Sequence, residues 1–193
     1  MSVHIDPGDA LLAVDVHRDF LAGGSLTVPN GDAIVPILNR YIELAQRAKL
    51  PIFASRDWHP RNHCSFRQRG GPWPDHCVAG TAGAAFAAEL QLPAETTVIS
   101  KATRPDADSY SAFHDTALAS LLRERGVKRL LVGGLATDYC VLNTVRDALN
   151  EGFGVLLLTD AIRAVDAGSG DGQRAEAKMR EAGAVPATIG DFA

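Results

Sequence analysis

Short runs of apolar residues alternate with longer segments of mixed polarity along the chain. Five such runs occupy residues 10–14, 52–54, 98–99, 130–132 and 155–158. Each run is almost continuously apolar, which is typical of a strand buried on both faces of a parallel sheet. A further strand is expected near residues 185–189. Strands that alternate with helical segments predict a three-layer α/β/α fold, Rossmann-like, with a mainly parallel sheet of about six strands.

The segments between these runs carry helical periodicity. Helices are predicted over residues 33–48, 118–125, 141–151 and 174–181. The first has Pro36 in its first turn, and the second and third are closed by Gly126 and Gly152. Thr137 or Asp138 is the natural N-cap of the third helix. Residues 168–173 are expected to form a loop before the last helix.

One segment, residues 58–83, shows neither an apolar strand run nor helical periodicity, and it is rich in Pro, Gly, His and Arg. A structureless stretch of this length in a compact domain is usually functional. No repeat or low-complexity linker divides the chain, and 193 residues suit one domain. The sequence therefore predicts a single domain over 1–193 with a functional loop region at about 57–83.

Composition and charge narrow the class of partner. The chain is 46% hydrophobic and 22% charged, as soluble globular domains are, and its net charge is −4 with no basic run. This argues against a nucleic-acid or anionic-membrane surface. No apolar run approaches the ~20 residues of a bilayer span, and the N-terminus lacks a secretory pattern. We expect a cytoplasmic protein with a small-molecule substrate; a homo-oligomer is compatible with the sequence, which does not set the oligomeric state.

Reactive side chains follow the predicted strands at one edge of the sheet. Asp15, Asp57 and Lys101 end the first three, and the fourth leads through two glycines to Cys140. The crevice of an open α/β sheet lies beyond these carboxyl ends. A helix N-terminus and Lys101 would stabilise a Cys140 thiolate, while Asp15 could take a proton and return it to a leaving amine. The alternative is a buried, inert cysteine.

The irregular segment carries a second candidate group. Asp57 and His59 flank one residue, so on an extended segment their side chains point to the same side. With His76 they would give one carboxylate and two imidazoles, an open set that suits a divalent ion. That set suits zinc, iron and manganese alike, and we expect zinc. His63 is a candidate fourth ligand or a residue that supports a ligand.

These segments resemble the isochorismatase-like cysteine hydrolases and, among them, the nicotinamidases. The resemblance covers most of the chain and rests on AVDVHRDFLAGGSL, SRDWHPRNHCSF, WPDHCVAGT, ISKATRPDADSYSAF and GLATDYCV. It implies an enzyme that deamidates nicotinamide, and also pyrazinamide, through a cysteine thioester. One departure is His17 and Arg18, where the family more often has Gln and Asn.

The resemblance also implies roles for individual residues. It implies a catalytic triad, a one-metal site, an oxyanion hole of two backbone amides, and aromatic contacts to the substrate ring. These are Asp15, Lys101 and Cys140; Asp57, His59 and His76; the amides of Ala136 and Cys140; and Phe20, Trp73 and Tyr110. It further implies a non-proline cis peptide between Leu135 and Ala136.

Three other hypotheses stay open at this point. Relatives with the same triad hydrolyse carbamoyl or ureido amides without a metal, although the DWH and WPDHC segments argue against that activity. A closed zinc site could use Cys64 and Cys77, but neither has C-x-x-C spacing. The chain could instead be a non-catalytic metal-binding or ligand-binding module in which Cys140 is a redox-sensitive thiol.

Overall fold

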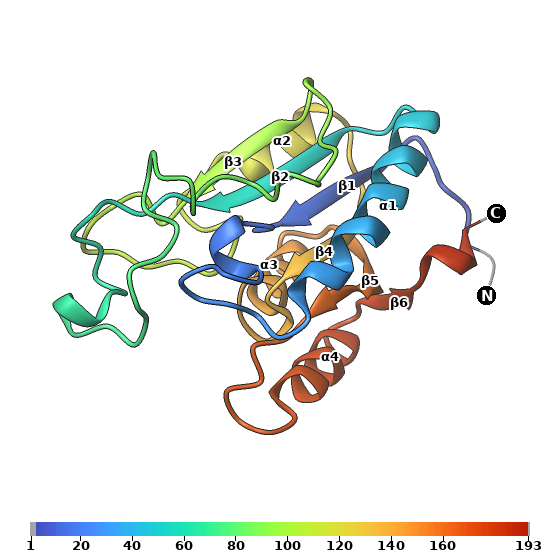
Figure 1. Ribbon diagram of the computed structural model, residues 1–193. Helices are drawn as coiled ribbons and strands as arrows, with labels where there is room; N and C mark the ends of the chain where they lie inside the picture. The colour runs from blue at the N-terminus through green and yellow to red at the C-terminus, as the bar shows by residue number, and fades with distance from the viewer. Residues whose placement is uncertain (1–2, 193) are drawn as a thin grey trace.

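Six parallel strands form the sheet at the centre of the protein in a computed structural model that describes residues 3–192 (Figure 1). In spatial order they are β3 (Thr97–Lys101), β2 (Ile52–Asp57), β1 (Asp9–Val14), β4 (Arg129–Leu135), β5 (Gly154–Arg163) and β6 (Val185–Ala187). Every residue of β1 is buried, as its continuous apolar run predicts. The predicted α/β fold class is confirmed.

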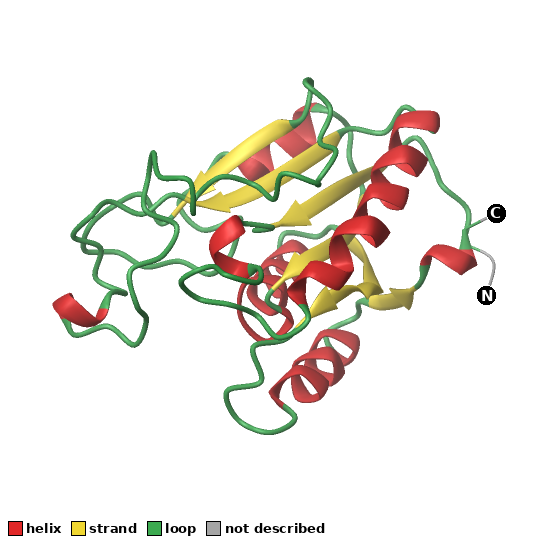
Figure 2. Ribbon diagram, in the orientation of Figure 1, coloured by secondary structure: helices red, strands yellow, loops and turns green. Residues whose placement is uncertain are grey.

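Helices cover both faces of the sheet (Figure 2). They are α1 (Val35–Arg47) on one face, and α2 (Leu118–Glu124), α3 (Leu142–Asn150) and α4 (Asp171–Glu181) on the other. Short 3₁₀ turns lie at Arg18–Phe20, Gly31–Ile34, Arg67–Arg69 and Ile189–Asp191, and a π-helical turn at Thr137–Val141 precedes α3. Within residues 3–192, no helix is both long and apolar enough to cross a membrane.

Two hydrophobic cores form because successive side chains of a strand point to opposite faces of the sheet. Leu11 of β1 joins the core that includes Leu38 of α1. Its neighbour Leu12 joins the core that includes Leu122 of α2 and Val145 of α3. The sheet is thus held between two apolar layers, and its polar residues are left for the strand ends.

Several boundaries differ from the sequence prediction, and two of them have a clear local cause. Helix α4 begins at Asp171, three residues before the expected 174, because Gly170 takes up the left-handed conformation and ends the loop. The Asp171 carboxylate accepts a hydrogen bond from the amide of Gly168, which ties the loop to the first turn. Strand β5 extends to Arg163 because its pairing with β4 resumes after an irregularity at Val132/Gly134.

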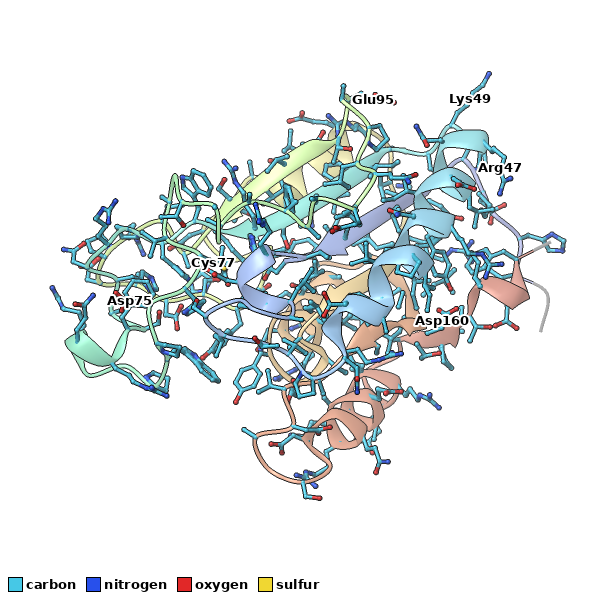
Figure 3. The ribbon with its side chains drawn as sticks, in the orientation of Figure 1. Arg47, Lys49, Asp75, Cys77, Glu95 and Asp160 are labelled. Atoms are coloured by element: carbon cyan, nitrogen blue, oxygen red, sulfur yellow. The ribbon has the colours of Figure 1, made fainter. Side chains whose placement is uncertain are left out.

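The strand order is 3-2-1-4-5-6. The chain adds β2 and β3 on one side of β1 and then β4, β5 and β6 on the other side, so the order of strands reverses between β1 and β4. Ligands of doubly wound sheets bind at this switch point, beyond the carboxyl ends of the strands. The irregular loops gather at that end of β1, β2 and β3 (Figures 1 and 2). Asp75 and Cys77 lie in these loops, far from Arg47, Lys49 and Glu95 at the other end (Figure 3).

The close approach of β1 and β4 at the switch point depends on Gly134. This residue pairs with Val14, has a φ of 134°, and leaves no room for a side chain. A Cβ atom there would lie 2.0 Å from the carbonyl oxygen of Val14. A glycine is therefore required where the strands that carry the site separate.

We expect Gly134→Ala to lower the free energy of unfolding by roughly 2–4 kcal/mol, since it adds backbone strain to a steric clash with backbone atoms. Urea unfolding followed by circular dichroism measures the change. Gly154→Ala is the matched control, because its Cβ would meet only the Arg129 side chain at an ordinary 3.4 Å. Equal stabilities of the two variants would show that β1 can move away from β4.

Candidate active site

The backbone turns sharply where the site begins. Asp15 follows β1 with a φ of 50°, and Ala102 follows β3 with a φ of 49°. In the long loop, Cys77 has a φ of 46° directly after His76. A non-glycine residue with a positive φ, in the left-handed region of backbone conformation, costs on the order of 1 kcal/mol, and such strain is frequent at functional sites. Three of the seven non-glycine residues with positive φ in the described part of the chain therefore lie at, or next to, candidate catalytic or metal-binding residues.

A buried lysine links the candidate catalytic residues. The ammonium of Lys101 lies 3.0 Å from Oδ2 of Asp15 and 3.6 Å from Sγ of Cys140. It donates hydrogen bonds to Oδ1 of Asp57 and to the carbonyl oxygen of Ser109. Its side chain is fully buried. The structure thus brings the three residues expected as a triad into one contact group, which Asp57 joins.

Asp15 has one carboxylate oxygen fixed and the other available. Oδ1 accepts a hydrogen bond of 2.6 Å from the hydroxyl of Ser55. Oδ2 is buried and makes an ion pair with Lys101, but no hydrogen bond of good geometry satisfies it within the described residues. A carboxylate oxygen of Asp15 and Sγ of Cys140 lie within 4.8 Å of each other. Oδ2 is therefore placed to accept the thiol proton.

Burial and charge set the resting protonation states. Burial alone would lower the pKa of Lys101, but Asp15 and Asp57 raise that pKa well above its usual value, so the ammonium persists. Burial raises the pKa of Cys140 well above its usual range; Lys101 opposes this effect and Asp15 adds to it. The Lys101 ammonium does favour a thiolate, as the sequence analysis expected, but it is already paired with two carboxylates. The net effect of burial and charge is therefore to favour the thiol form of Cys140 in the metal-free protein.

Asp57, His59 and His76 form a second group whose ligand atoms all lie within 4.8 Å of one another. Nδ1 of His59 lies 3.2 Å from the carbonyl oxygen of Ala102, and Nδ1 of His76 lies 2.8 Å from that of Pro74. Because a carbonyl only accepts, each Nδ1 carries the proton and each Nε2 is left as a free ligand atom.

Electrostatics also favour a cation here. Asp15 and Asp57 carry two negative charges and Lys101 one positive charge, so the buried group keeps one uncompensated negative charge. Burial lowers the pKa of His59 to about 4, with opposition from Asp57, so its imidazole is neutral as a metal ligand must be. The donor set of one carboxylate and two imidazoles therefore fits a divalent ion.

His63 lies beside this group without joining it. Its Nδ1 accepts hydrogen bonds from the amide and hydroxyl of Ser65, and its Nε2 lies 3.2 Å from the carbonyl oxygen of Ala107. Its ring stacks on that of His59 with centroids 4.2 Å apart. These contacts place His63 against His59 and outside the candidate ligand group. Neither Cys64 nor Cys77 belongs to any candidate metal group of the described residues.

A pocket with an empty volume of about 380 Å³, part of it open to solvent, connects the two groups. Cys140, Asp57 and His76 line it together with largely apolar side chains. The aromatic and aliphatic residues of its wall are Phe20, Leu26, Val28, Trp73, Tyr110, Ala136, Tyr139 and Val165. The three aromatic residues expected at the ring, Phe20, Trp73 and Tyr110, are among them.

Tyr139 is a pocket residue that the sequence analysis missed. Its ring lies edge-on to that of Trp73, with centroids 5.1 Å apart, and 5.4 Å from that of Tyr110. The indole nitrogen of Trp73 donates a hydrogen bond to the hydroxyl of Tyr110. The position of Tyr139 next to Cys140 in the sequence was the signal that could have identified it as a pocket residue. These three rings form one connected wall of the pocket.

The segment around the thiol differs from the expected helix start. The helical turn begins after Ala136, so neither Thr137 nor Asp138 is its N-cap. The Asp138 carboxylate instead accepts hydrogen bonds from two amides of the loop after β5, those of Val165 and Asp166. Cys140 still lies in the first turn, and a cis peptide joins Leu135 to Ala136.

Comparison with known proteins gives consistent similarities. The isochorismatase domain family matches residues 9–191. The chain is 41% identical to the nicotinamidase of Escherichia coli (strain K12), over 96% of this chain and 97% of that protein.

Two solved structures share the fold closely. The pyrazinamidase of Pyrococcus horikoshii in complex with zinc has a TM-score of 0.91 and 48% identity, with 94% of this chain and 99% of that chain covered. PnC1 from L. infantum in complex with nicotinate has a TM-score of 0.90 and 38% identity, with 100% and 99% covered.

The protonation of Cys140 predicts how it reacts with iodoacetamide. Because the pKa of Cys140 is raised, its thiolate forms only at high pH. The alkylation rate of the metal-free protein should therefore still be rising with pH at values above about 8.5, the ordinary pKa of a thiol. Peptide mapping by mass spectrometry measures the rate at each cysteine, with Cys140→Ala as the control. Both Cys140 and Cys77 are buried, but only Cys140 lines the pocket, so we expect Cys140 to react before Cys77. A rate at Cys140 that levels off below pH 8 would indicate a resting thiolate and contradict this assignment.

Proposed function

The chain belongs to the isochorismatase family, and from that premise we propose that it is a nicotinamidase, which hydrolyses nicotinamide to nicotinate and ammonia and also accepts pyrazinamide. The observation that carries the proposal is the pocket in which Cys140, with Lys101 and Asp15 behind it, shares one aromatic-walled space with Asp57 and His76. The nicotinamidase of Escherichia coli and the nicotinate-bound PnC1, similar along nearly all of the chain, support it.

In the proposed reaction, Asp15 takes the proton from Cys140 as the sulfur attacks the carboxamide carbon. The backbone amides of Ala136 and Cys140 stabilise the negative charge on the carbonyl oxygen. Asp15 then gives its proton to the leaving nitrogen, and ammonia departs as the C–N bond breaks. The acyl group stays on the sulfur as a thioester. Asp15 then deprotonates a water molecule that attacks the thioester carbon, and it passes this proton to the sulfur as the C–S bond breaks. The nicotinic acid formed releases its own proton to solvent and leaves as nicotinate.

Lys101 acts on charge rather than on the substrate. Its ammonium lies 3.6 Å from the sulfur and faces the carboxylate that gains the proton. When Asp15 is protonated, the ammonium loses that negative partner and stabilises the thiolate instead. One cation thus serves whichever of the two groups is ionised.

The set of Asp57, His59 and His76 is proposed to hold one divalent ion, zinc before iron or manganese. The pyrazinamidase of Pyrococcus horikoshii, similar in fold and sequence, was solved in complex with zinc. When bound, such an ion supplies an open coordination position that suits a ring nitrogen. The carbonyl oxygens of Ala102 and Pro74 hold the two imidazoles in the ligand tautomer.

The aromatic residues would hold the substrate ring. Phe20 and the connected wall of Trp73, Tyr110 and Tyr139 line the same pocket. Aromatic faces favour a flat pyridine ring and fix its plane, which directs the carboxamide to the sulfur. Alignment of this kind contributes to rate because it removes rotational freedom before the attack.

The proposed catalytic unit predicts non-additive losses. Asp15→Asn and Lys101→Ala should each lower kcat for nicotinamide by at least about 100-fold, as expected for loss of a general acid–base group or of its cation. The double variant should lose little more, because residues of one unit do not act independently. Ammonia release measures the rates, and circular dichroism establishes that each variant folds. Two mild losses that multiply in the double variant would assign these residues a structural role.

The metal proposal is tested with two amides. Nicotinamide and benzamide share the carboxamide, but benzamide has no ring nitrogen. We expect nicotinamide to be strongly preferred by the metal-loaded enzyme, and chelation or His59→Ala to remove most of that preference through a higher KM. Pyrazinamide, which keeps a nitrogen in the matching position, should be hydrolysed. Equal rates on nicotinamide and benzamide, unchanged after verified removal of the metal, would favour a metal-independent amidase.

A further inference from the structure

His17 is a buried polar residue to which the proposed mechanism gives no role. It lies between Asp15 and Phe20 in the sequence and is fully buried. Its ring bridges two segments of backbone. Nε2 accepts a hydrogen bond of 2.9 Å from the amide of Asp57, and Nδ1 lies 3.0 Å from the carbonyl oxygen of Ala84. An amide only donates and a carbonyl only accepts, so the ring is held as the neutral tautomer with its proton on Nδ1.

The bond to Asp57 continues the ladder between β1 and β2 past the end of β1. The amide of Asp15 donates to the carbonyl oxygen of Ser55, the last regular bond on this side. The carbonyl oxygen of Asp15, which would face the next amide of β2, accepts from the amide of His17 instead. The amide of Asp57 would then lack its ladder partner, and the imidazole of His17 takes that place.

Aromatic contacts fix the position of the imidazole. It stacks on Phe86, with centroids 5.8 Å apart and planes 5° apart, and lies edge-on to Phe20 at 5.4 Å. Backbone bonds on either side, from Arg18 to Ala85 and from Ala87 to Val16, hold this stack together. The side chain cannot leave Asp57 without disturbing Phe20, which lines the pocket.

We propose that His17 is a positioning residue that holds Asp57 at the end of β2 and Phe20 at the pocket wall through one imidazole. The consequence for a metal rests on the proposed function, whereas the contact with Asp57 does not. Oδ1 of Asp57 accepts a hydrogen bond from Lys101, and Oδ2 of Asp57 lies 3.7 Å from Nε2 of His59. A small rotation of the strand end would therefore disturb both partners of that carboxylate.

The chemistry of the imidazole suggests two informative substitutions. A glutamine offers the same pair of groups, an oxygen acceptor for Asp57 and an amide donor for Ala84, without the aromatic ring. A phenylalanine keeps a ring against Phe86 but can neither accept nor donate. His17→Phe therefore tests the hydrogen bonds, and His17→Gln tests the packing of the ring.

Hydrogen exchange at the Asp57 amide, measured by NMR on the metal-free full chain, is the first readout. We expect exchange to be at least about 10-fold faster in His17→Phe than in wild type and close to wild type in His17→Gln, because exchange follows local opening of the bond. His4→Phe, the same change at an exposed histidine, should leave it unaltered. If His17→Phe does not fold, His17→Asn, whose amide is too short to reach Asp57, replaces it. Equal exchange in all variants would overturn the proposal.

Zinc affinity, measured by competition with a chromogenic chelator, is the second readout. Loss of a residue that orients a metal ligand typically weakens binding 10–100-fold, so we expect about 10-fold or more for His17→Phe and near recovery for His17→Gln. Unaltered zinc affinity in His17→Phe would refute the consequence for the metal. If exchange and zinc affinity follow the expected order while wild type releases no ammonia from nicotinamide, the proposed function fails and the role of His17 stands.

Discussion

The rest of the site depends on the buried ammonium of Lys101. Asp15 follows β1 and Asp57 ends β2, and both carboxylates are buried, where two negative charges could not both persist unless a cation lay between them. The register of β2 and β3 places Lys101 beside Asp57, so the lysine ammonium lies next to the carboxylates. Removing one partner of a buried ion pair typically costs roughly 3–5 kcal/mol. The same contact therefore holds three strand ends together and provides the charge that the sulfur needs.

Much of this arrangement could be predicted from the sequence. Continuous apolar runs identify buried parallel strands, and parallel strands place their carboxyl ends on one edge, so Asp15, Asp57, Lys101 and Cys140 were expected to meet there. The order of the strands could not be predicted from periodicity. It depends on pairings such as Val14 with Gly134, which are non-local and require the whole sheet.

Other features follow from tertiary contacts that a linear pattern does not contain. Asp138 looks like a helix cap, yet it bonds to amides that lie 27 and 28 residues further along. The protonation of Cys140 depends on how many carboxylates share Lys101, which no spacing in the sequence shows. Ser55 and His17 matter because of the atoms that they reach across the sheet edge. Residue type alone would assign both to ordinary polar positions.

The shared carboxylate of Asp57 has a thermodynamic consequence. Its Oδ1 bonds to Lys101 and its Oδ2 faces His59, so one group belongs to both the nucleophile and the metal set. A cation bound by the metal set weakens the negative field that Asp57 exerts on Lys101 and Cys140. Linkage requires that the ionisation of Cys140 in turn changes the affinity for the cation by the same free energy. The shift that a bound cation causes in the pKa of the cysteine and the change that thiol deprotonation causes in the affinity for the cation are then the same coupling free energy. A substitution that alters Asp57 therefore acts on both equilibria at once.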